Sequence, residues 1–461
     1  MSADLQLTVV KPGDLERAFA GAAGPASTET YITDSFVLSE CTITIKSGRV
    51  IDLQAVIQEI VFFEDMFSPN ITGSILIQDM AGGHEKFILT GGEKITIRVM
   101  RGDRGETIIA RADLVVYEIS KMKVDNQNSL TYDLRFTTET AIKSHKKRVF
   151  KSFGSDRKIS SIVKKLYKEI NDEFKIFIQD FDTAAERPFI CPGYNPIEAI
   201  QFLAKRACID GNYYVFFERV NTNIITGNNF SHYFANVKYL KAFITLGVPK
   251  LTVQPAIKYT TKPGQTEIQI RSYQIQQNFN HMTAMTQGYY NSNVKSLNLL
   301  SKSVNNSTIN YKQRNANQLG DVYRNSYLDA YNVFNVYDQG DVPGERLIIA
   351  PQSDIISNKS EWIKQDLYGA ITNSAIRLIV EIPGGNNKIG VGDIVDINIP
   401  SIANKLVNQQ NSLVPNDAVY SGNYMVTAVK HMITKTVYVK RLEVSRGTFR
   451  FDIDQIIALG Q

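Results

Sequence analysis

The chain has 461 residues, 43% of them hydrophobic and 21% charged, and carries a net charge of +5. This length allows about three domains, and the composition excludes a disordered or fibrous chain. The three cysteines form no CxxC pair, which excludes a disulfide framework and a zinc site of the usual spacing, so we expect folding in a reducing cytoplasm.

The N-terminal residues 1–30 lack the basic start and apolar run of a signal peptide. We expect them to form a flexible arm. No segment reaches the roughly 18 consecutive apolar residues that a membrane-spanning helix needs. The sequence therefore predicts no stable membrane insertion.

A first β region is predicted at residues 31–142. Short runs of alternating polar and apolar residues, rich in β-branched and aromatic side chains, are separated by turn residues such as Gly91 and Gly92. The pattern is typical of an antiparallel barrel or sandwich. The predicted strands are residues 43–53, 56–67, 71–80, 93–99, 113–120 and 130–138.

The pattern changes to a small α+β domain at residues 143–250. Residues 158–170 place apolar side chains on one helical face and lysines on the other. A second helix is predicted from Asn195, with Pro196 in its first turn and Glu198 in the reciprocal capping position. A strand follows in YYVFFE, residues 213–218.

The same domain begins with a strongly basic run. Residues 143–175 contain eleven Lys or Arg against four Asp or Glu. Such a patch can bind nucleic acid, anionic lipid or an acidic partner surface, and the simpler alternative is a solvated helix face. The candidate partner-contact residues are Lys143, Lys146, Lys147, Arg148 and Lys151.

A second, discontinuous β region is predicted at residues 251–280 plus 362–450. Between its two parts lies a polar insertion, residues 281–361, whose Asn-rich and Tyr-rich composition favours surface loops. Residues 359–372 have a helical pattern, and 451–461 form a C-terminal tail.

The two β regions share a repeated pattern. In each, a glycine and an acidic residue precede alternating hydrophobic residues, and a hairpin follows, YMVTAVKHM in the second region matching LVVYEISKM in the first. This match makes His431 the counterpart of Lys121 in the first region. We therefore expect His431 to be a strand residue and not a catalytic residue. Chance similarity between alternating strands is the rival explanation. The candidate ring-strand and subunit-interface residues are Gly92, Glu93, Ile95, Ile97, Gly392, Asp393, Val395, Ile397, Val426 and His431.

Motifs for catalysis are missing from the sequence. His84 begins an HExxH-like segment, but Ile88 stands at the second histidine position. Neither GxSxG nor GxxxxGK[ST] occurs, and the histidines have no metal-ligand spacing. We predict no catalytic residue, no cofactor and no metal. Two alternatives stay open: a peptidoglycan hydrolase using Glu64 and Asp65, and a carbohydrate-binding module using tyrosines or Trp362.

Several segments together resemble a known family. They are residues 61–80 with GGEKITI, residues 186–218, residues 382–400, residues 420–433 and RLEVSRG, and their order is more specific than any one of them. The chain resembles the central baseplate hub proteins of contractile-tailed bacteriophages, which are related to phage late-control proteins and to the hub part of type VI secretion spike proteins. The resemblance spans most of residues 43–447.

This resemblance implies a mainly β fold, with two similar antiparallel β-barrel domains joined by a small α+β domain. It also implies a homotrimer in the virion baseplate, assembled in the cytoplasm of the host bacterium, that adapts a sixfold tail tube to a threefold central spike. The expected partners are the tail tube or tube-initiator protein and the spike, with wedge and tape-measure proteins as further candidates. DNA would only pass through its channel, and no catalytic residue is carried over.

Overall fold

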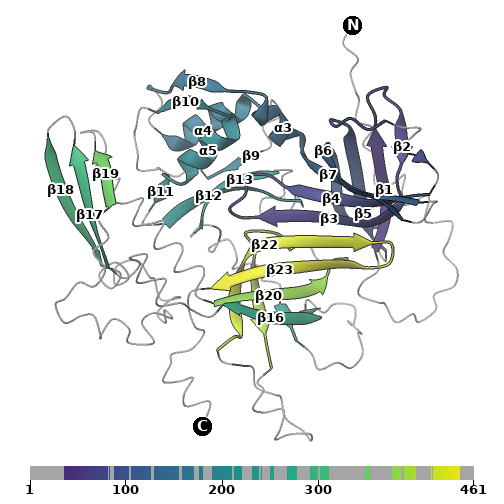
Figure 1. Cartoon of the computed structure of the whole chain (residues 1–461). Helices are drawn as coiled ribbons and strands as arrows, with labels where there is room; N and C mark the ends of the chain where they lie inside the picture. Colours follow the sequence, from purple (N-terminus) through teal and green to yellow (C-terminus); the bar gives the residue numbers. More distant parts are fainter. Residues whose placement is uncertain are drawn as a thin grey trace, which may run out of the picture.

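The computed structural model describes residues 36–80, 82–83, 88–102, 105–125, 129–154, 158–170, 176–179, 189–209, 212–220, 231–237, 240, 250–253, 267–277, 291–298, 302–310, 348–352, 376–385, 389–400, 417 and 419–446. The fold is mainly β, with large antiparallel sheets and a few short helices, as the sequence predicts (Figure 1). No helix in these ranges is long and apolar enough to cross a membrane.

The first β unit contains seven strands paired in the order β3-β4-β7-β6-β5-β1-β2. Their alternating residues bury one face, because successive side chains of a strand point to opposite sides. The predicted single strand at 43–53 is instead a hairpin, since Gly48 turns the chain with a φ of 82°. The strands are β1 (Phe36–Thr44), β2 (Val50–Asp52), β3 (Ile57–Asp65), β4 (Thr72–Asp79), β5 (Lys94–Arg101), β6 (Thr107–Asp125) and β7 (Ser129–Thr138).

The second β unit has the same strand order. Its series β16-β20-β23-β22-β21-β14 corresponds to β3-β4-β7-β6-β5-β1, although β14 runs parallel to β21 whereas β1 runs antiparallel to β5. The strands are β14 (Lys250–Thr252), β15 (Glu267–Gln269), β16 (Ser272–Gln277), β20 (Ile376–Pro383), β21 (Ile394–Asn398), β22 (Gly422–Thr434) and β23 (Tyr438–Arg446).

Matched hydrogen bonds confirm the repeat predicted from the sequence. Gly92 N donates to Val116 O at 2.7 Å, and Val116 N donates to Glu93 O at 2.9 Å. In the second unit Gly392 N donates to Val426 O at 2.9 Å, and Val426 N donates to Asp393 O at 2.8 Å. Both glycines have positive φ, 90° and 86°. The strand that follows each glycine therefore starts from the same turn.

The equivalence extends into both hairpins and shifts by one residue beyond Ser120. A β-bulge follows Val116 in β6 and Val426 in β22, after which Ser120 lies opposite Asp133 and Lys430 opposite Arg441. Beyond this point only β6 contains a second bulge, at Lys121, whose φ is 55°. The prediction that His431 and Lys121 are interchangeable is wrong, because His431 is buried whereas the Lys121 side chain is 72% exposed.

The two units share one continuous sheet. β22 pairs antiparallel with β3, from Ala428 opposite Asp65 to Thr434 opposite Glu59. The resulting sheet has 14 strands and crosses from one unit into the other (Figure 1). The core of the first unit accordingly includes Ile433 and Tyr438 from the second.

The middle unit is α+β, and its two longer helices fall where the sequence predicts them. In α4, Ile162, Val163 and Leu166 are buried, and Lys165 and Lys168 are exposed. At the start of α5, Asn195 and Glu198 form the predicted capping box. The elements are α3 (Glu139–His145), β8 (Val149–Ser152), α4 (Ile159–Lys168), β9 (Ile176–Ile178), β10 (Ile190–Tyr194), α5 (Pro196–Ala204), β11 (Cys208–Ile209), β12 (Asn212–Glu218) and β13 (His232–Asn236).

Strands β12 and β13 form a layer between the helices and the second β unit. Tyr214 and Phe216 pack in the core with α4 and α5, whereas the alternate residues Val215 and Phe217 pack in the core of the second unit. In Figure 1 these strands lie between the helices above and β22 and β23 below. The middle unit thus packs against the second unit through one face of its own sheet, β11-β12-β13-β9.

The predicted insertion contains a three-stranded sheet in the order β18-β17-β19. Its strands are β17 (Asn291–Asn298), β18 (Ser303–Asn310) and β19 (Ile348–Gln352). The predicted arm 1–30, the helix at 359–372, Trp362 and the tail 451–461 lie outside the described residues. The domain boundaries stay predictions.

Candidate functional site

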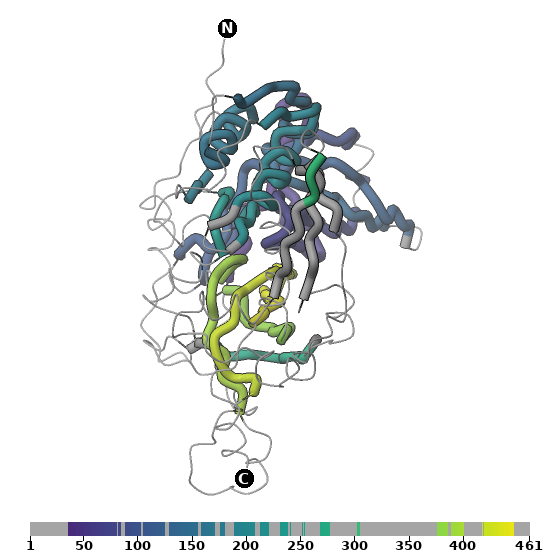
Figure 2. Tube along the Cα trace, turned by 90° about the vertical axis from the view of Figure 1, so that its left-hand side faces the viewer, coloured from purple at the N-terminus to yellow at the C-terminus, as the bar shows by residue number. Residues whose placement is uncertain are grey.

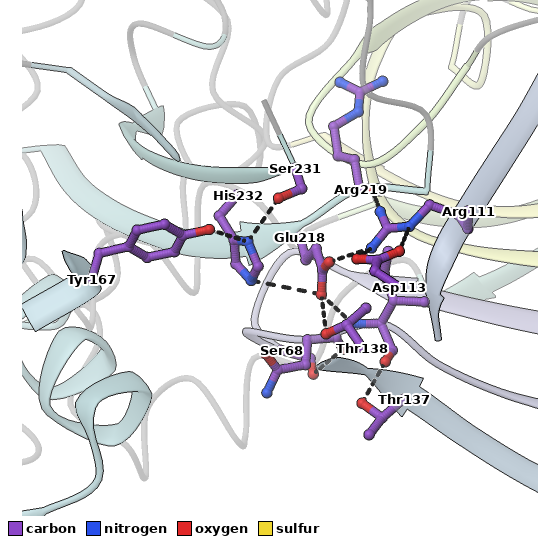
Figure 3. Close-up of polar contacts among 12 residues, drawn as sticks. Ser68, Arg111, Asp113, Thr137, Thr138, Tyr167, Glu218, Arg219, Ser231 and His232 are labelled. Carbon is purple, nitrogen blue, oxygen red and sulfur yellow. Dashed lines mark hydrogen bonds and ion pairs between the residues drawn. The ribbon is translucent and has the colours of Figure 1, made fainter. Parts of the chain in front are cut away.

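The end of β12 carries two buried residues of opposite charge, Glu218 and Arg219. They are adjacent in the chain, and Glu218 is 1% and Arg219 0% exposed. Because neighbouring residues of a strand project to opposite sides, the two side chains diverge. Figure 3 shows Glu218 directed toward Arg111 and Thr138, and Arg219 directed away from them.

Glu218 binds the first β unit. Its Oε1 accepts a 2.6 Å hydrogen bond from Arg111 Nη2, and its Oε2 accepts from Thr138 Oγ1 at 3.0 Å and from the amide of Ile71 at 3.1 Å. Arg111 also binds both carboxylate oxygens of Asp113 at 2.8 Å. Charged hydrogen bonds of this length are stronger than neutral ones. Both oxygens of the buried carboxylate are therefore satisfied by β6, β7 and the start of β4.

A histidine of the middle unit completes this cluster. His232 Nδ1 lies 3.1 Å from Tyr167 Oη and 3.1 Å from Ser231 Oγ, and its Nε2 lies 3.6 Å from Glu218 Oε2 (Figure 3). Burial lowers the pKa of His232, against the opposing effect of the Glu218 charge. The lowered pKa favours the neutral imidazole, which contacts Tyr167 of helix α4 and lies beside Glu218, beyond hydrogen-bond distance of its carboxylate.

Arg219 binds the second β unit. Its Nη1 and Nη2 donate to the two oxygens of Asp393 at 2.8 and 2.7 Å, a bidentate pair. Its own carbonyl oxygen accepts from Arg111 at 2.9 Å. Asp393 is the acidic residue of the repeated Gly-acid pattern. The second unit is thereby held through the same repeated turn that starts β21.

The junction between β3 and β22 has its own buried polar chain. His431 Nε2 lies 2.8 Å from Glu64 Oε1, and its Nδ1 lies 2.8 Å from Tyr438 Oη. Lys440 is also fully buried and donates to the carbonyl oxygen of Ile389 at 3.0 Å. Glu64 comes from the first unit and the other three side chains from the second, so this chain of contacts crosses the shared sheet.

The pKa directions fix the protonation states in this chain. Burial lowers the pKa of His431, although the hydrogen bond to Glu64 opposes that effect. Burial alone would raise the pKa of Glu64, but the hydrogen bond from His431 and nearby cations hold it below its usual value. Burial raises the pKa of Tyr438 and lowers that of Lys440 to about 7. A neutral His431 therefore donates from Nε2 to an ionised Glu64, and its Nδ1 accepts a hydrogen bond from the Tyr438 hydroxyl group.

This arrangement resembles a catalytic relay in composition, but its side chains are closed off from solvent in the single chain. His431 and Tyr438 are 0% exposed, and Glu64 is 2% exposed. Asp65 follows Glu64 on β3 but is exposed on the opposite side of the strand. The two carboxylates proposed for a hydrolase therefore do not face a common space. Within the described residues, no group of His, Cys, Asp or Glu side chains could hold a metal ion.

Most of the predicted ring-strand side chains lie in the core of the single chain. Of the ten candidate residues, all except Gly92 and Asp393 are buried, and the buried ones include every apolar side chain of the set. β5 and β21 are also paired on both edges. Side-chain contacts of these two strands with another subunit would therefore come from the alternate residues, such as Lys94 and Asp396. The role of both strands in a ring stays a prediction.

The predicted basic patch is exposed and partly neutralised. Lys143 lies on α3 and Lys151 on β8, with Lys146, Lys147 and Arg148 in the connection between them. The patch has several acceptors within the chain: Glu139 at 3.5 Å from Lys143, Glu198 at 3.4 Å from Arg148, and the Glu169 carbonyl bound by Lys147. Its function as a partner contact stays a prediction.

The sequence did not identify the residues that join the three units. Arg111, Glu218, Arg219 and Asp393 come from distant positions in the chain, and only Asp393 belonged to a noted pattern. A glutamate and an arginine at the end of an apolar strand give no local sign of burial. Their partners follow only from the tertiary pairing.

Comparison of the structure with solved proteins relates the fold to phage tails. A 43 kDa tail protein of prophage MuSo2 from Shewanella oneidensis superposes with a TM-score of 0.51 at 10% sequence identity, over 88% of this chain and 98% of that one. The chain has the fold of a phage tail protein. At this identity the likeness concerns the fold alone.

Two further structures superpose with TM-scores below 0.5. A tail protein from Neisseria meningitidis MC58 has a TM-score of 0.48 at 8% identity, covering 89% of this chain and 97% of that one. A type VI secretion component from E. coli has 0.42 at 8% identity, covering 86% and 75%. No protein-family model and no curated protein matches the sequence.

Proposed function

We propose that this chain is a structural protein of a contractile phage tail, and that it forms the homotrimeric hub of the baseplate. The observation that carries the proposal is the shared fold with a phage tail protein, which extends over 88% of this chain and 98% of that protein. A likeness over nearly all of both chains includes the β units and the middle unit together.

The internal repeat supports a role in matching symmetries. Three copies of a chain with two equivalent β units present six similar units around one axis. Such a ring fits a sixfold tail tube on one side and a threefold spike on the other. The matched turns at Gly92 and Gly392 support this equivalence between the units.

We further propose that each unit closes into a barrel. In the first unit β2 pairs with β1 while β3, which follows it in the chain, pairs with β4. In the second unit β15 pairs with β14 and the following β16 pairs with β20. The first and last strands of each series are thus consecutive in the chain. This arrangement is suited to closing the series into a barrel, which leaves few exposed edges.

The proposed partners follow from the position of a hub. The tube or tube-initiator protein and the central spike would bind opposite faces of the ring, and wedge or tape-measure proteins would bind its periphery. DNA would pass through the central channel without a specific site. We assign the basic patch around Lys147 to one of the protein partners, and we assign no enzymatic activity to the chain.

Negative-stain electron microscopy of the purified chain tests this proposal. We expect projections with threefold symmetry and a central hole. Compact single-chain particles at every concentration would contradict the hub. Peptidoglycan cleavage by the purified chain that is lost in Glu64→Gln would favour a hydrolase instead.

A further inference from the structure

Among the strands that the structure describes, each β unit has one edge that lacks the pairing made by the equivalent edge of the other unit. β22 is paired on one side by β23 and, along residues 428–434, on the other side by β3. The equivalent strand β6 is paired by β7, but beyond Val115 its second edge pairs with no other strand in the described part of the chain. No strand within the described ranges therefore pairs with the edge of β6 that corresponds to the β3-binding edge of β22.

A matching edge exists at the other end of the strand series. β3 pairs with β4 on one side and with β22 on the other. Its equivalent, β16, pairs with β20 only, among the strands that the structure describes. In Figure 2 the blue β6–β7 hairpin projects to the right, whereas the teal β16 lies near the lower end of the molecule. One chain cannot join these two edges to each other.

The apolar residues of the internal contact have counterparts on both uncovered edges. Internally, Ile433 lies opposite Ile60, and both are buried. Following the ladders through β7 and β23, Val124 takes the position of Ile433, because Val124 pairs with Leu130 as Ile433 pairs with Tyr438. Val124 is 69% exposed in the single chain.

The residues of β16 correspond to those of β3 in the same way. Phe62 pairs with Gly73 as Ile275 pairs with Leu378, so Ile275 takes the position of Phe62 and Tyr273 that of Ile60. Ile275 is 39% exposed, although its counterpart Phe62 is fully buried beneath β22. Exposed apolar residues on an unpaired strand edge are a liability unless another strand covers them.

We propose that β16 of one copy of the chain pairs antiparallel with β6 of the next copy, in the register of the internal β3–β22 contact. This inference rests on the proposed trimeric hub and names the strands that join its subunits. The two edges differ, so the contact is heterologous and either closes into a ring or extends into a filament. The β3–β22 contact inside each chain and the β16–β6 contact between chains then alternate around the ring.

The internal contact includes a buried polar hydrogen bond that the proposed contact between copies does not have. The internal contact contains the buried Glu64–His431 hydrogen bond, which crosses from β3 to β22. On β6 the position near His431 contains the bulge at Lys121, whose side chain is exposed and paired with Asp133 in its own unit. The contact between copies is therefore mainly backbone and apolar pairing, which allows separately folded chains to assemble.

Disulfide trapping tests the register. Met432 lies opposite Val61 in the internal contact, and the equivalent positions are Lys123 and Gln274, both exposed in the single chain. Directly opposite residues of antiparallel strands are close enough for a disulfide. We expect the full-length double variant Lys123→Cys/Gln274→Cys to form a covalent trimer on mild oxidation, with none larger, and each single variant to form no such species.

A matched control uses the wrong register. Glu118→Cys/Gln274→Cys places the thiols roughly 16 Å apart along the strand at about 3.3 Å per residue, and we expect no covalent trimer. Val124→Asp should abolish the trimer with an unchanged thermal midpoint, whereas Val437→Asp, at an exposed turn residue, should retain it.

The outcomes separate this inference from the proposed hub. A wild-type trimer whose correct-register cysteines do not cross-link would overturn the β16–β6 pairing and leave the hub intact. Covalent species growing beyond the trimer would indicate a filament and would also overturn the ring contact. A wild-type chain that stays monomeric, without cross-linking of the double variant, would overturn both.

Discussion

Glu218 and Arg219 are neighbours in the chain, and their side chains bind different β units. The carboxylate of Glu218 accepts from Arg111 of β6 at 2.6 Å, and the guanidinium of Arg219 donates to Asp393, just before β21, at 2.7 Å. One peptide unit thus fixes the middle unit to both β units.

Removal of Arg219 should therefore destabilise the whole chain. Arg219→Met leaves Asp393, whose side chain is 13% exposed, without the fully buried guanidinium that binds it in a bidentate pair. Breaking such a largely buried pair costs up to about 3–5 kcal/mol. We expect that decrease in the free energy of unfolding, measured by urea denaturation. Arg135→Met provides the control, because its ion pair with Glu118 is exposed and is worth under ~1 kcal/mol. Equal losses of unfolding free energy in the two variants would contradict a stabilising role of the Arg219–Asp393 pair.

Acid should weaken the fold through its buried histidines. Burial lowers the pKa of both His232 and His431 from the ordinary value of 6.5. As the pH falls below 6.5, the unfolded chain takes up protons that the folded chain does not yet bind. The free energy of unfolding therefore decreases with falling pH, down to the folded pKa values. Thermal melts between pH 7 and roughly pH 5 measure this slope.

Substitutions assign that slope to residues. His431→Gln and His232→Gln should each make the pH dependence shallower, and the double variant more so. His145→Gln provides the control, because His145 is exposed on α3. A double variant with the wild-type slope would show that other groups cause the acid sensitivity.

The two repeated glycines should differ in their tolerance of alanine. Gly92 and Gly392 have φ values of 90° and 86°, so a side chain at either is strained by about 1–3 kcal/mol. A Cβ at Gly392 would also lie 3.1 Å from the Phe217 ring, whereas one at Gly92 would meet nothing within 4 Å. Chemical denaturation should therefore show a larger loss for Gly392→Ala than for Gly92→Ala. The reverse order would contradict the packing of β21 against β12.

Gly73 on β4 should tolerate alanine poorly for a different reason. A Cβ there would lie 2.3 Å from Phe136 and from the carbonyl oxygen of Val61. Overpacking of this kind costs about 1–3 kcal/mol or more. We expect Gly73→Ala to lower the thermal midpoint, and Gly154→Ala, with no contact closer than 3.8 Å, to leave it nearly unchanged. Equal midpoints would show that the β3–β4–β7 layer can yield.

Local patterns predicted much of the fold because the forces that they report are local. The apolar face of α4 and the capping box at Asn195 and Glu198 are set by residues within a few positions of one another. The Gly-acid pattern predicted equivalent turns for a similar reason, since a positive φ requires glycine. These features needed no knowledge of tertiary contacts.

Long-range features could not be predicted in the same way. The contact between His431 and Glu64 joins residues 367 positions apart, and nothing near either residue indicates the other. The bulge at Lys121 likewise displaces the equivalence by one residue, whereas the aligned sequences continue past Ser120 without a gap. Alternation fixes which face a strand residue occupies, but it does not identify the neighbouring strand.

Native mass spectrometry of the full-length chain tests the central claim of a trimeric hub most directly. We expect a complex of three 51.8 kDa chains that persists on dilution. A single 51.8 kDa species at all concentrations, from protein whose thermal melt is cooperative, would contradict it.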